Sequence, residues 1–167
     1  IRLLALLQMH GRLDAKVMLE YALQRIYDSP SDVTMAAAAA EAKVQYSALV
    51  LGATGNVGGR IVQLLIKNPL CKKVVVVTRR KTDTFADPKV SEVVVNMDRL
   101  EEEVAPHAQG VDVALAAFGV GKGSAKMPEE EVRKIEVAYP QAFCPAAKAA
   151  GARVCGVMTA VGADPAA

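Results

Sequence analysis

The chain has 167 residues, of which 52% are hydrophobic, and its 20 basic and 18 acidic residues leave a formal charge of +2. A chain of this length buries one good core, so we expect one globular domain with a modest appendage. The small net charge argues against nucleic acid and membrane surfaces as partners, and no apolar stretch approaches the roughly 18 residues of a membrane span.

Residues 1–28 contain apolar side chains, mostly leucines, at helical spacing. Ser29–Asp32 interrupts this pattern, and an alanine-rich run follows. We therefore expect a helical extension over residues 1–34, a linker over 35–45 and the main domain over 46–167. Because residues 1–28 are too apolar to remain exposed, we expect them to dock either on their own domain or on a protein partner.

From residue 46 onward, short apolar runs alternate with segments of helical periodicity. This alternation is typical of a parallel sheet with helices on both faces, which binds ligands at the carboxyl ends of its strands. Pro140 and Pro145 fall inside the last helix and predict that it is bent or interrupted. The expected strands are 47–52, 73–78, 92–96, 111–118 and 153–158, and the expected helices are 57–67, 99–105 and 129–150.

Three glycines at a spacing of three, Gly52, Gly55 and Gly58, separate the first strand from the first helix. This spacing predicts a dinucleotide-binding turn: Gly52 allows a tight exit from the strand, Gly55 lets the backbone approach a pyrophosphate, and Gly58 lets the helix pack closely on the sheet. The phosphates would accept hydrogen bonds from N–H groups at the helix N-terminus. An ordinary strand-to-helix turn is the alternative. The predicted cofactor-binding residues here are Gly52, Thr54, Gly55, Asn56, Val57 and Gly58.

The second strand is followed by basic residues, Arg79 and Arg80. Proteins that bind the ribose 2′-hydroxyl usually carry an acidic residue in this region. Guanidinium groups bind phosphates bidentately, so this pair favours a 2′-phosphate and hence NADP(H) as the cofactor. A solvated basic turn is the alternative.

Two further groups of residues follow expected strands. Asn96 and Asp98 are placed to hydrogen-bond the edge of an adenine, although turn chemistry explains them equally well. The segment Ala116, Ala117 and Phe118 ends the fourth strand with small residues, which suit either a ribose or nicotinamide or plain sheet packing. We predict that Asn96, Ala116, Ala117 and Phe118 bind the cofactor.

Three cysteines, Cys71, Cys144 and Cys155, are too few and too scattered to predict a disulfide framework, and with two histidines they form no metal-ligand spacing. We therefore expect no metal and a reducing compartment, which favours the cytoplasm. Ile1 as the first residue hints at processing and keeps a mitochondrial location as the alternative.

Six segments are distinctive in their order and spacing, namely Gly52–Gly58, Val77–Lys81, Val94–Leu100, Gly110–Val113, Ala147–Gly151 and Val161–Pro165. Together they resemble an atypical short-chain dehydrogenase/reductase of the Tat-interacting-protein oxidoreductase family. The resemblance implies a Rossmann fold with NADP(H) in the glycine turn, and it supports Arg79 and Arg80 as the 2′-phosphate site.

The chain also departs from that family. Reductases of this superfamily use a serine after the fifth strand and a Tyr-x-x-x-Lys pair further on. Here Thr159 and Ala160 replace the family's two serines, which makes Thr159 a catalytic candidate only with a shift in register. Ala167 is reached before any Tyr-Lys segment, so we expect a doubly wound sheet that stops after its fifth strand and leaves an open edge.

These features predict an NADP(H)-binding Rossmann protein that is non-catalytic as given and acts as an accessory or assembly subunit. Its partners would be the nucleotide and a protein bound through residues 1–28 or through the open sheet edge. The alternative is an NADP(H)-dependent oxidoreductase of the short-chain type whose Tyr-Lys segment lies beyond this chain. A module that senses the NADP(H) redox state is a third possibility.

Overall fold

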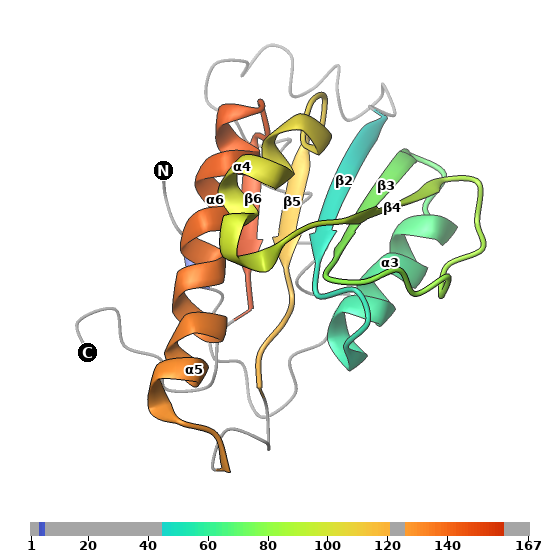
Figure 1. The fold of residues 1–167 in the computed structure, drawn as a ribbon. Coiled ribbons are helices and arrows are strands. Elements are labelled where there is room, and N and C mark those ends of the chain that lie inside the picture. The colour runs from blue at the N-terminus through green and yellow to red at the C-terminus, as the bar shows by residue number, and fades with distance from the viewer. Residues whose placement is uncertain (1–3, 6–44, 121–125, 159–167) are drawn as a thin grey trace.

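The computed structural model describes residues 4–5, 45–120 and 126–158. Its six strands form one sheet in the order β1-β6-β5-β2-β3-β4, and every neighbouring pair is parallel (Figure 1). The carboxyl ends of these strands therefore share one edge of the sheet. The strands are β1 (Leu4–Ala5), β2 (Tyr46–Leu51), β3 (Cys71–Thr78), β4 (Val90–Val94), β5 (Val113–Ala116) and β6 (Val154–Val157).

Helices cover both faces of the sheet, as the alternating pattern predicts. Helix α3 (Asn56–Lys67) covers one face, and α4 (Leu100–Val104) and α6 (Tyr139–Ala149) cover the other. Helix α5 (Glu129–Arg133), which has no buried residue, extends past the ends of the strands. Short turns flank these helices, namely the 3-10 turns η2 (Met97–Arg99) and η3 (Ala105–His107) and the π-helical turn η5 (Lys134–Ala138). The α/β, doubly wound, Rossmann-like architecture is confirmed.

The two faces of the sheet have separate apolar cores because side chains alternate along each strand. Ala48 and Val50 of β2 point toward α3, whereas Leu49 and Leu51 point toward α4 and α6. All four side chains are buried, which is typical of a central parallel strand. The predicted strands and helices all occur, with ends that differ by a few residues where each enters its turn.

The predicted interruption of the last helix is confirmed at Pro140. This proline has no backbone N–H, so it cannot close the usual hydrogen bond to the residue four positions earlier. The chain forms the wider turn η5 directly before α6, whose first turn contains Pro140. Pro145 lies inside α6.

The expected open edge after the fifth strand needs a correction, because β1 pairs with β6. Leu4 lies opposite Gly156 and Ala5 opposite Val157, so these two residues form a strand rather than the predicted helix. A short leucine-rich run suits a buried strand as well as a helix, and the unpaired backbone groups of β6 favour the strand. Residues 1–3 and 6–44, which hold the rest of the predicted extension and all of the predicted linker except residue 45, lie outside the described residues.

The interpretation of the cysteines also needs a correction, because Cys144 and Cys155 form a disulfide. Their Cα atoms are 5.9 Å apart, since the turn between α6 and β6 folds the helix back over the strand. The spacing in the sequence could not reveal this. Cys71 is free and buried, and burial raises the pKa of its thiol.

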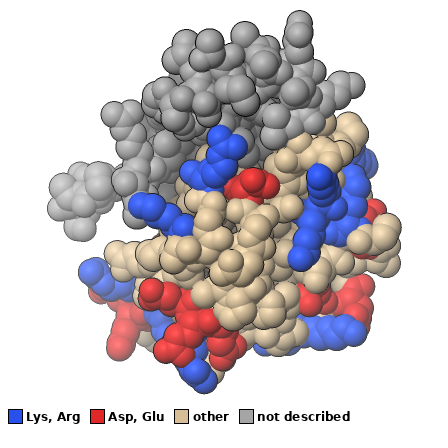
Figure 2. Space-filling view, turned by 90° about the horizontal axis from the view of Figure 1, so that it is seen from above, with Lys and Arg blue, Asp and Glu red and all other residues tan. Residues whose placement is uncertain are grey.

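Basic and acidic side chains are intermixed on the surface at the amino-terminal ends of the strands (Figure 2). Among the helices of the described residues, none has the length and apolar composition that a bilayer crossing requires.

Candidate cofactor-binding site

The glycine turn follows β2 at the carboxyl edge of the sheet. Gly52 has a φ of +87°, a conformation that glycine adopts readily and L-residues with side chains rarely do. A Cβ at Gly52 would lie 2.6 Å from the Cβ of Phe118 and 2.7 Å from the carbonyl oxygen of Ala117. The N–H of Gly55 donates to the carbonyl oxygen of Gly52 at 3.1 Å and closes the turn. Both the backbone conformation and the close packing therefore require glycine at position 52.

Gly58 allows α3 to approach the turn. A Cβ at this position would collide with the carbonyl oxygen of Gly52, so the helix backbone lies directly against the turn. Gly58, Ile61, Val62 and Leu65 form the buried stripe of α3, at the spacing expected of one helix face. The packing role predicted for Gly58 matches this geometry.

The N-terminus of α3 is exposed and has no side-chain cap. Gly55 occupies the N-cap position without a side chain that accepts a hydrogen bond, and the first turn contains no acidic residue. Thr54, Gly55 and Asn56 are exposed, while Val57 is half-buried. The first N–H groups of a helix have no intrahelical partner and carry a partial positive charge. This end of α3 has the donors that a phosphate needs.

The end of β5 lies against the glycine turn. The N–H of Ala117 donates to the carbonyl oxygen of Leu51 at 2.9 Å, which continues the pairing of β5 with β2. Ala116 and Ala117 are buried, and Phe118 is half-buried. The structure therefore brings the predicted residues Ala116–Phe118 next to the glycine turn.

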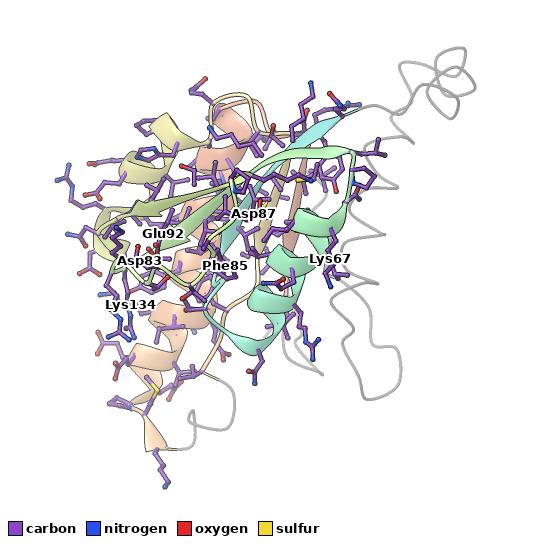
Figure 3. All side chains as sticks on the ribbon, turned by 90° about the vertical axis from the view of Figure 1, so that its right-hand side faces the viewer. Lys67, Asp83, Phe85, Asp87, Glu92 and Lys134 are labelled. Atoms are coloured by element: carbon purple, nitrogen blue, oxygen red, sulfur yellow. A yellow bond between two sulfur atoms is a disulfide. The ribbon has the colours of Figure 1, made fainter. Side chains whose placement is uncertain are left out.

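The basic loop, which we define as residues 79–84, follows β3 at the same edge. Arg79 and Arg80 are exposed. Glu92 of β4 faces this loop, and its carboxylate accepts hydrogen bonds from Thr78 at 3.2 Å, from Thr82 at 2.8 and 2.9 Å, and from Asp83 at 3.2 Å. Figure 3 shows Glu92 beside Asp83. Reasoning from the sequence missed Glu92, and its only signal is an acidic residue among valines.

Hydrogen bonding sets the direction of the pKa shift of Glu92. Desolvation alone would raise the pKa of this carboxyl, but the donors of Thr82, Asp83 and Thr78 together outweigh it. The pKa of Glu92 is therefore lowered, and the group is a carboxylate at neutral pH. Lys81 forms an ion pair with Asp83 at 3.0 Å, which raises the pKa of Lys81.

Asn96 lies after β4, and both its backbone and its side chain bond within the chain. Its Oδ1 accepts from the N–H of Asp98 at 2.9 Å, and its own N–H donates to Glu103 at 2.7 Å. This is the turn chemistry that was the alternative to adenine binding. A contact between Asn96 and adenine stays a prediction.

A hollow of about 340 Å³ lies between the η2–α4 segment and the helix formed by η5 and α6. Asp98 and Lys134 form an ion pair across it, which raises the pKa of Lys134. The sequence carries no local signal for this hollow, because α4 and α6 meet only in the folded chain. Its lining residues are Met97, Asp98, Arg99, Leu100, Glu101, Glu102, Lys134, Ala138, Tyr139 and Ala142.

The π-helical turn η5 contacts the segment that follows β5. Glu136 accepts a hydrogen bond from the N–H of Val120 at 3.2 Å, and the ring of Tyr139 lies 6.0 Å from that of Phe118. π-Helical turns are frequent at functional sites. In the sequence, Pro140 indicated an interruption of the helix here. It did not indicate that Glu136 bonds to Val120.

The predicted catalytic candidate, Thr159, lies outside the described residues. Within the described residues, no group of three or more His, Cys, Asp or Glu side chains is arranged to hold a metal ion.

Comparison with known protein families gives a match that agrees with this geometry. Residues 52–167, more than half of the chain, match the NAD(P)H-binding family. The chain belongs to this family. The matched region starts at Gly52, so it includes the glycine turn, the basic loop and the end of β5.

Individual relatives and solved structures are more distant. Protein FMP52, mitochondrial, from Candida albicans is 31% identical over 120 residues, which cover 71% of this chain and 52% of that protein. The chain thus spans about half the length of this relative. The crystal structure of uronate dehydrogenase from Agrobacterium tumefaciens has a TM-score of 0.57 at 19% identity and covers 70% of this chain and 41% of that one. A mutant of that enzyme complexed with NAD has a TM-score of 0.56 at 19% identity, with 70% and 42% covered. These two likenesses show a shared Rossmann fold.

Proposed function

We propose that this NAD(P)H-binding domain prefers NADP(H). The observation that carries the proposal is the pair Arg79 and Arg80, exposed at the carboxyl edge that also holds the glycine turn. The nearby carboxylate of Glu92 already accepts four hydrogen bonds from its own chain, so it is poorly placed to accept a ribose hydroxyl. Guanidinium groups beside an occupied carboxylate favour a phosphate.

The proposed placement assigns one part of the cofactor to each segment of the site. The pyrophosphate would accept hydrogen bonds at the N-terminus of α3, and the 2′-phosphate would contact Arg79 and Arg80. The nicotinamide and its ribose would lie over Ala116–Phe118. The adenine would lie near Asn96, toward the hollow between α4 and α6.

The test compares two pairs of basic residues on the same strand-and-loop segment. Replacing both Arg79 and Arg80 with alanine should weaken NADPH binding roughly a hundredfold, since hydrogen bonds to charged groups are worth about 1.5–3 kcal/mol each. NADH affinity should change little. Lys72 and Lys73 are exposed near the start of β3, at the opposite edge, and their double alanine variant is the charge-matched control. Equal losses for NADPH and NADH would contradict the 2′-phosphate assignment.

A second candidate function is NADP(H)-dependent oxidoreduction by the whole protein. The family and the likeness to a dehydrogenase favour it, and the resemblance to the Tat-interacting-protein oxidoreductases suggests the same chemistry. The full-length protein should then oxidise NADPH when it is offered a panel of carbonyl compounds. Tight NADPH binding without turnover, together with recovery of the protein in a larger complex, would instead favour the accessory role.

We also propose a mitochondrial rather than a cytoplasmic location, on the name of the Candida albicans relative. Subcellular fractionation of cells that express the full-length protein tests this proposal.

A protein partner bound through residues 1–28 remains a proposal as well. Comparing the native mass of the chain with that of a variant lacking residues 1–34 tests that partner.

A further inference from the structure

We propose that Glu92 is a positioning residue for cofactor selectivity, which holds the basic loop so that Arg79 and Arg80 face a 2′-phosphate. The inference rests on the proposed preference for NADP(H) and extends it to a residue that does not itself contact the phosphate. Glu92 lies on a different strand from the arginines, and only the folded sheet brings it to their loop.

The sheet places Glu92 next to the end of β3. In the parallel pairing of β3 with β4, Glu92 lies opposite Val76, and Thr78 lies opposite Val94. Val76 and Val90 belong to the core under α3, and side chains alternate along a strand, so Glu92 projects from the same face as Val90. The carboxylate therefore emerges on the face of the sheet over which the basic loop turns.

One carboxylate contacts both ends of the arginine segment. Oε1 of Glu92 accepts from the N–H and hydroxyl of Thr82. It also shares the hydroxyl proton of Thr78, the last residue of β3, with the carbonyl oxygen of Val93, which lies 3.3 Å from that hydroxyl. Oε2 accepts from the N–H of Asp83. The hydrogen-bond donors on both sides of residues 79–81 therefore bond to the same carboxylate, that of Glu92.

The backbone beyond the arginines has an uncommon conformation. Asp83 has a φ of +50°, in the left-handed region that non-glycine residues seldom adopt. Its N–H is held by Glu92, and its carboxylate pairs with Lys81. Charge-assisted hydrogen bonds are stronger than neutral ones, so Glu92 is well suited to maintain this turn.

Residues 85–89, which follow the basic loop and lead into β4, are held by contacts that do not involve Glu92. Phe85 packs against the core under α3, and the ammonium of Lys89 donates to the carbonyl oxygens of Ile66 and Asn68 at 2.9 and 3.1 Å. Asp87 accepts from the N–H of Lys89 at 2.9 Å. Loss of the Glu92 contacts should therefore loosen the basic loop and leave residues 85–89 in place.

The arginines remain available to a ligand. Within the described part of the chain, neither Arg79 nor Arg80 forms an ion pair, while Glu92 and Asp83 are both engaged by their own loop. The acidic groups near the loop thus shape it, and the guanidinium groups carry the charge that recognises a phosphate.

The central variant is Glu92→Gln in the 167-residue chain. With its carbonyl oxygen at the Oε1 position, glutamine places an NH₂ group, which cannot accept a hydrogen bond, opposite the N–H of Asp83. The bonds that remain are no longer charge-assisted and are therefore weaker. We expect NADPH affinity to fall about tenfold, as for a loss of one to two hydrogen bonds to a charged group, with NADH affinity nearly unchanged. Asp87→Asn is the control, because it alters a carboxylate within residues 85–89, outside the basic loop. It should leave the affinities for NADPH and NADH unchanged.

A second measurement does not depend on any cofactor. Hydrogen exchange at the amides of Thr82 and Asp83 should be faster in Glu92→Gln than in the parent chain, while the amide of Val90 keeps its rate. Thr82→Val, which removes one hydroxyl donor, should show a weaker form of the same change in exchange and selectivity. Thr82→Ser keeps the hydroxyl and should behave like the parent chain. The two Thr82 variants also test the contact if Glu92→Gln does not fold.

The outcomes separate this inference from the proposal on which it rests. If the arginine double variant leaves the NADPH to NADH preference unchanged, the 2′-phosphate assignment fails, and this inference fails with it. If that variant loses the preference while Glu92→Gln and Thr82→Val keep it, only the role of Glu92 is overturned. Unchanged exchange at Thr82 and Asp83 in Glu92→Gln would overturn it as well.

Discussion

The glycine turn and the basic loop lie at the same edge of the sheet, yet different parts of the chain hold them in place. Backbone packing forms the glycine turn, because Gly52, Gly58 and the end of β5 approach so closely that side chains do not fit. Hydrogen bonds to the side chain of Glu92, on a neighbouring strand, hold the basic loop. The first region suits a feature common to all dinucleotides, the pyrophosphate, and the second suits a feature that distinguishes one dinucleotide from another.

The largest expected effect comes from filling the packed side of the glycine turn. In Gly58→Ala the added Cβ would collide with the carbonyl oxygen of Gly52, so α3 must move away from the sheet. We expect the free energy of unfolding to fall by about 3 kcal/mol, as for other severe packing clashes, measured by urea denaturation.

Gly59→Ala is the matched control for that change. It adds the same atom one residue further along α3, at 3.2 Å from the carbonyl oxygen of Ala53, where a small shift suffices. Alanine also has the higher helix propensity, by about 1 kcal/mol. A loss in Gly59→Ala as large as that in Gly58→Ala would contradict the special role of position 58.

The next effect separates folding from binding at the open side of the turn. Gly55 is exposed with an extended backbone, and a Cβ there would meet the carbonyl oxygen of Gly52 only at 3.4 Å. Gly55→Val should therefore fold, but its side chain would stand where a pyrophosphate approaches the backbone. We expect NADPH and NADH to weaken together, by roughly a hundredfold or more, in fluorescence titrations. Unchanged affinities would mean that the turn is only structural.

The smallest effect concerns the pH dependence of the basic loop. Since folding lowers the pKa of Glu92, its contribution to stability is present above the ordinary pKa of a glutamate and is lost as pH falls through the lowered value. The charge of Lys81 interacts with that of Glu92, and the Asp83 side chain, whose backbone N–H donates to Glu92, is paired with Lys81. The difference in unfolding free energy between the parent and Glu92→Gln should thus be largest near neutral pH and shrink below about pH 4. We expect about 1 kcal/mol at most, because the carboxylate is partly solvated. A difference that grows on acidification would contradict the lowered pKa.

Features that depend on residues close together in the chain could be predicted from the sequence. Strand and helix positions follow from local periodicity, and the role of Gly52 follows from a turn that spans only a few residues, so both were accessible. Pro140 likewise indicates locally that the last helix is interrupted. These features need no knowledge of what lies across the sheet.

The remaining features depend on contacts between segments far apart in the chain. Glu92 reaches Thr82 because β3 and β4 pair in one register, and Cys144 meets Cys155 because α6 folds back over β6. The pairing of Leu4 with Gly156 depends on which edge of the sheet is left open. Periodicity in a single window cannot contain such information.

The position of β1 has a consequence for how the protein is made. Leu4–Ala5 leaves the ribosome before its partner in the sheet, β6, which is synthesised after all the other strands described here. Contacts between such distant segments carry the greatest loop-closure cost and tend to form late. During synthesis, the residues of β1 must therefore remain unpaired while the strands between them and β6 assemble.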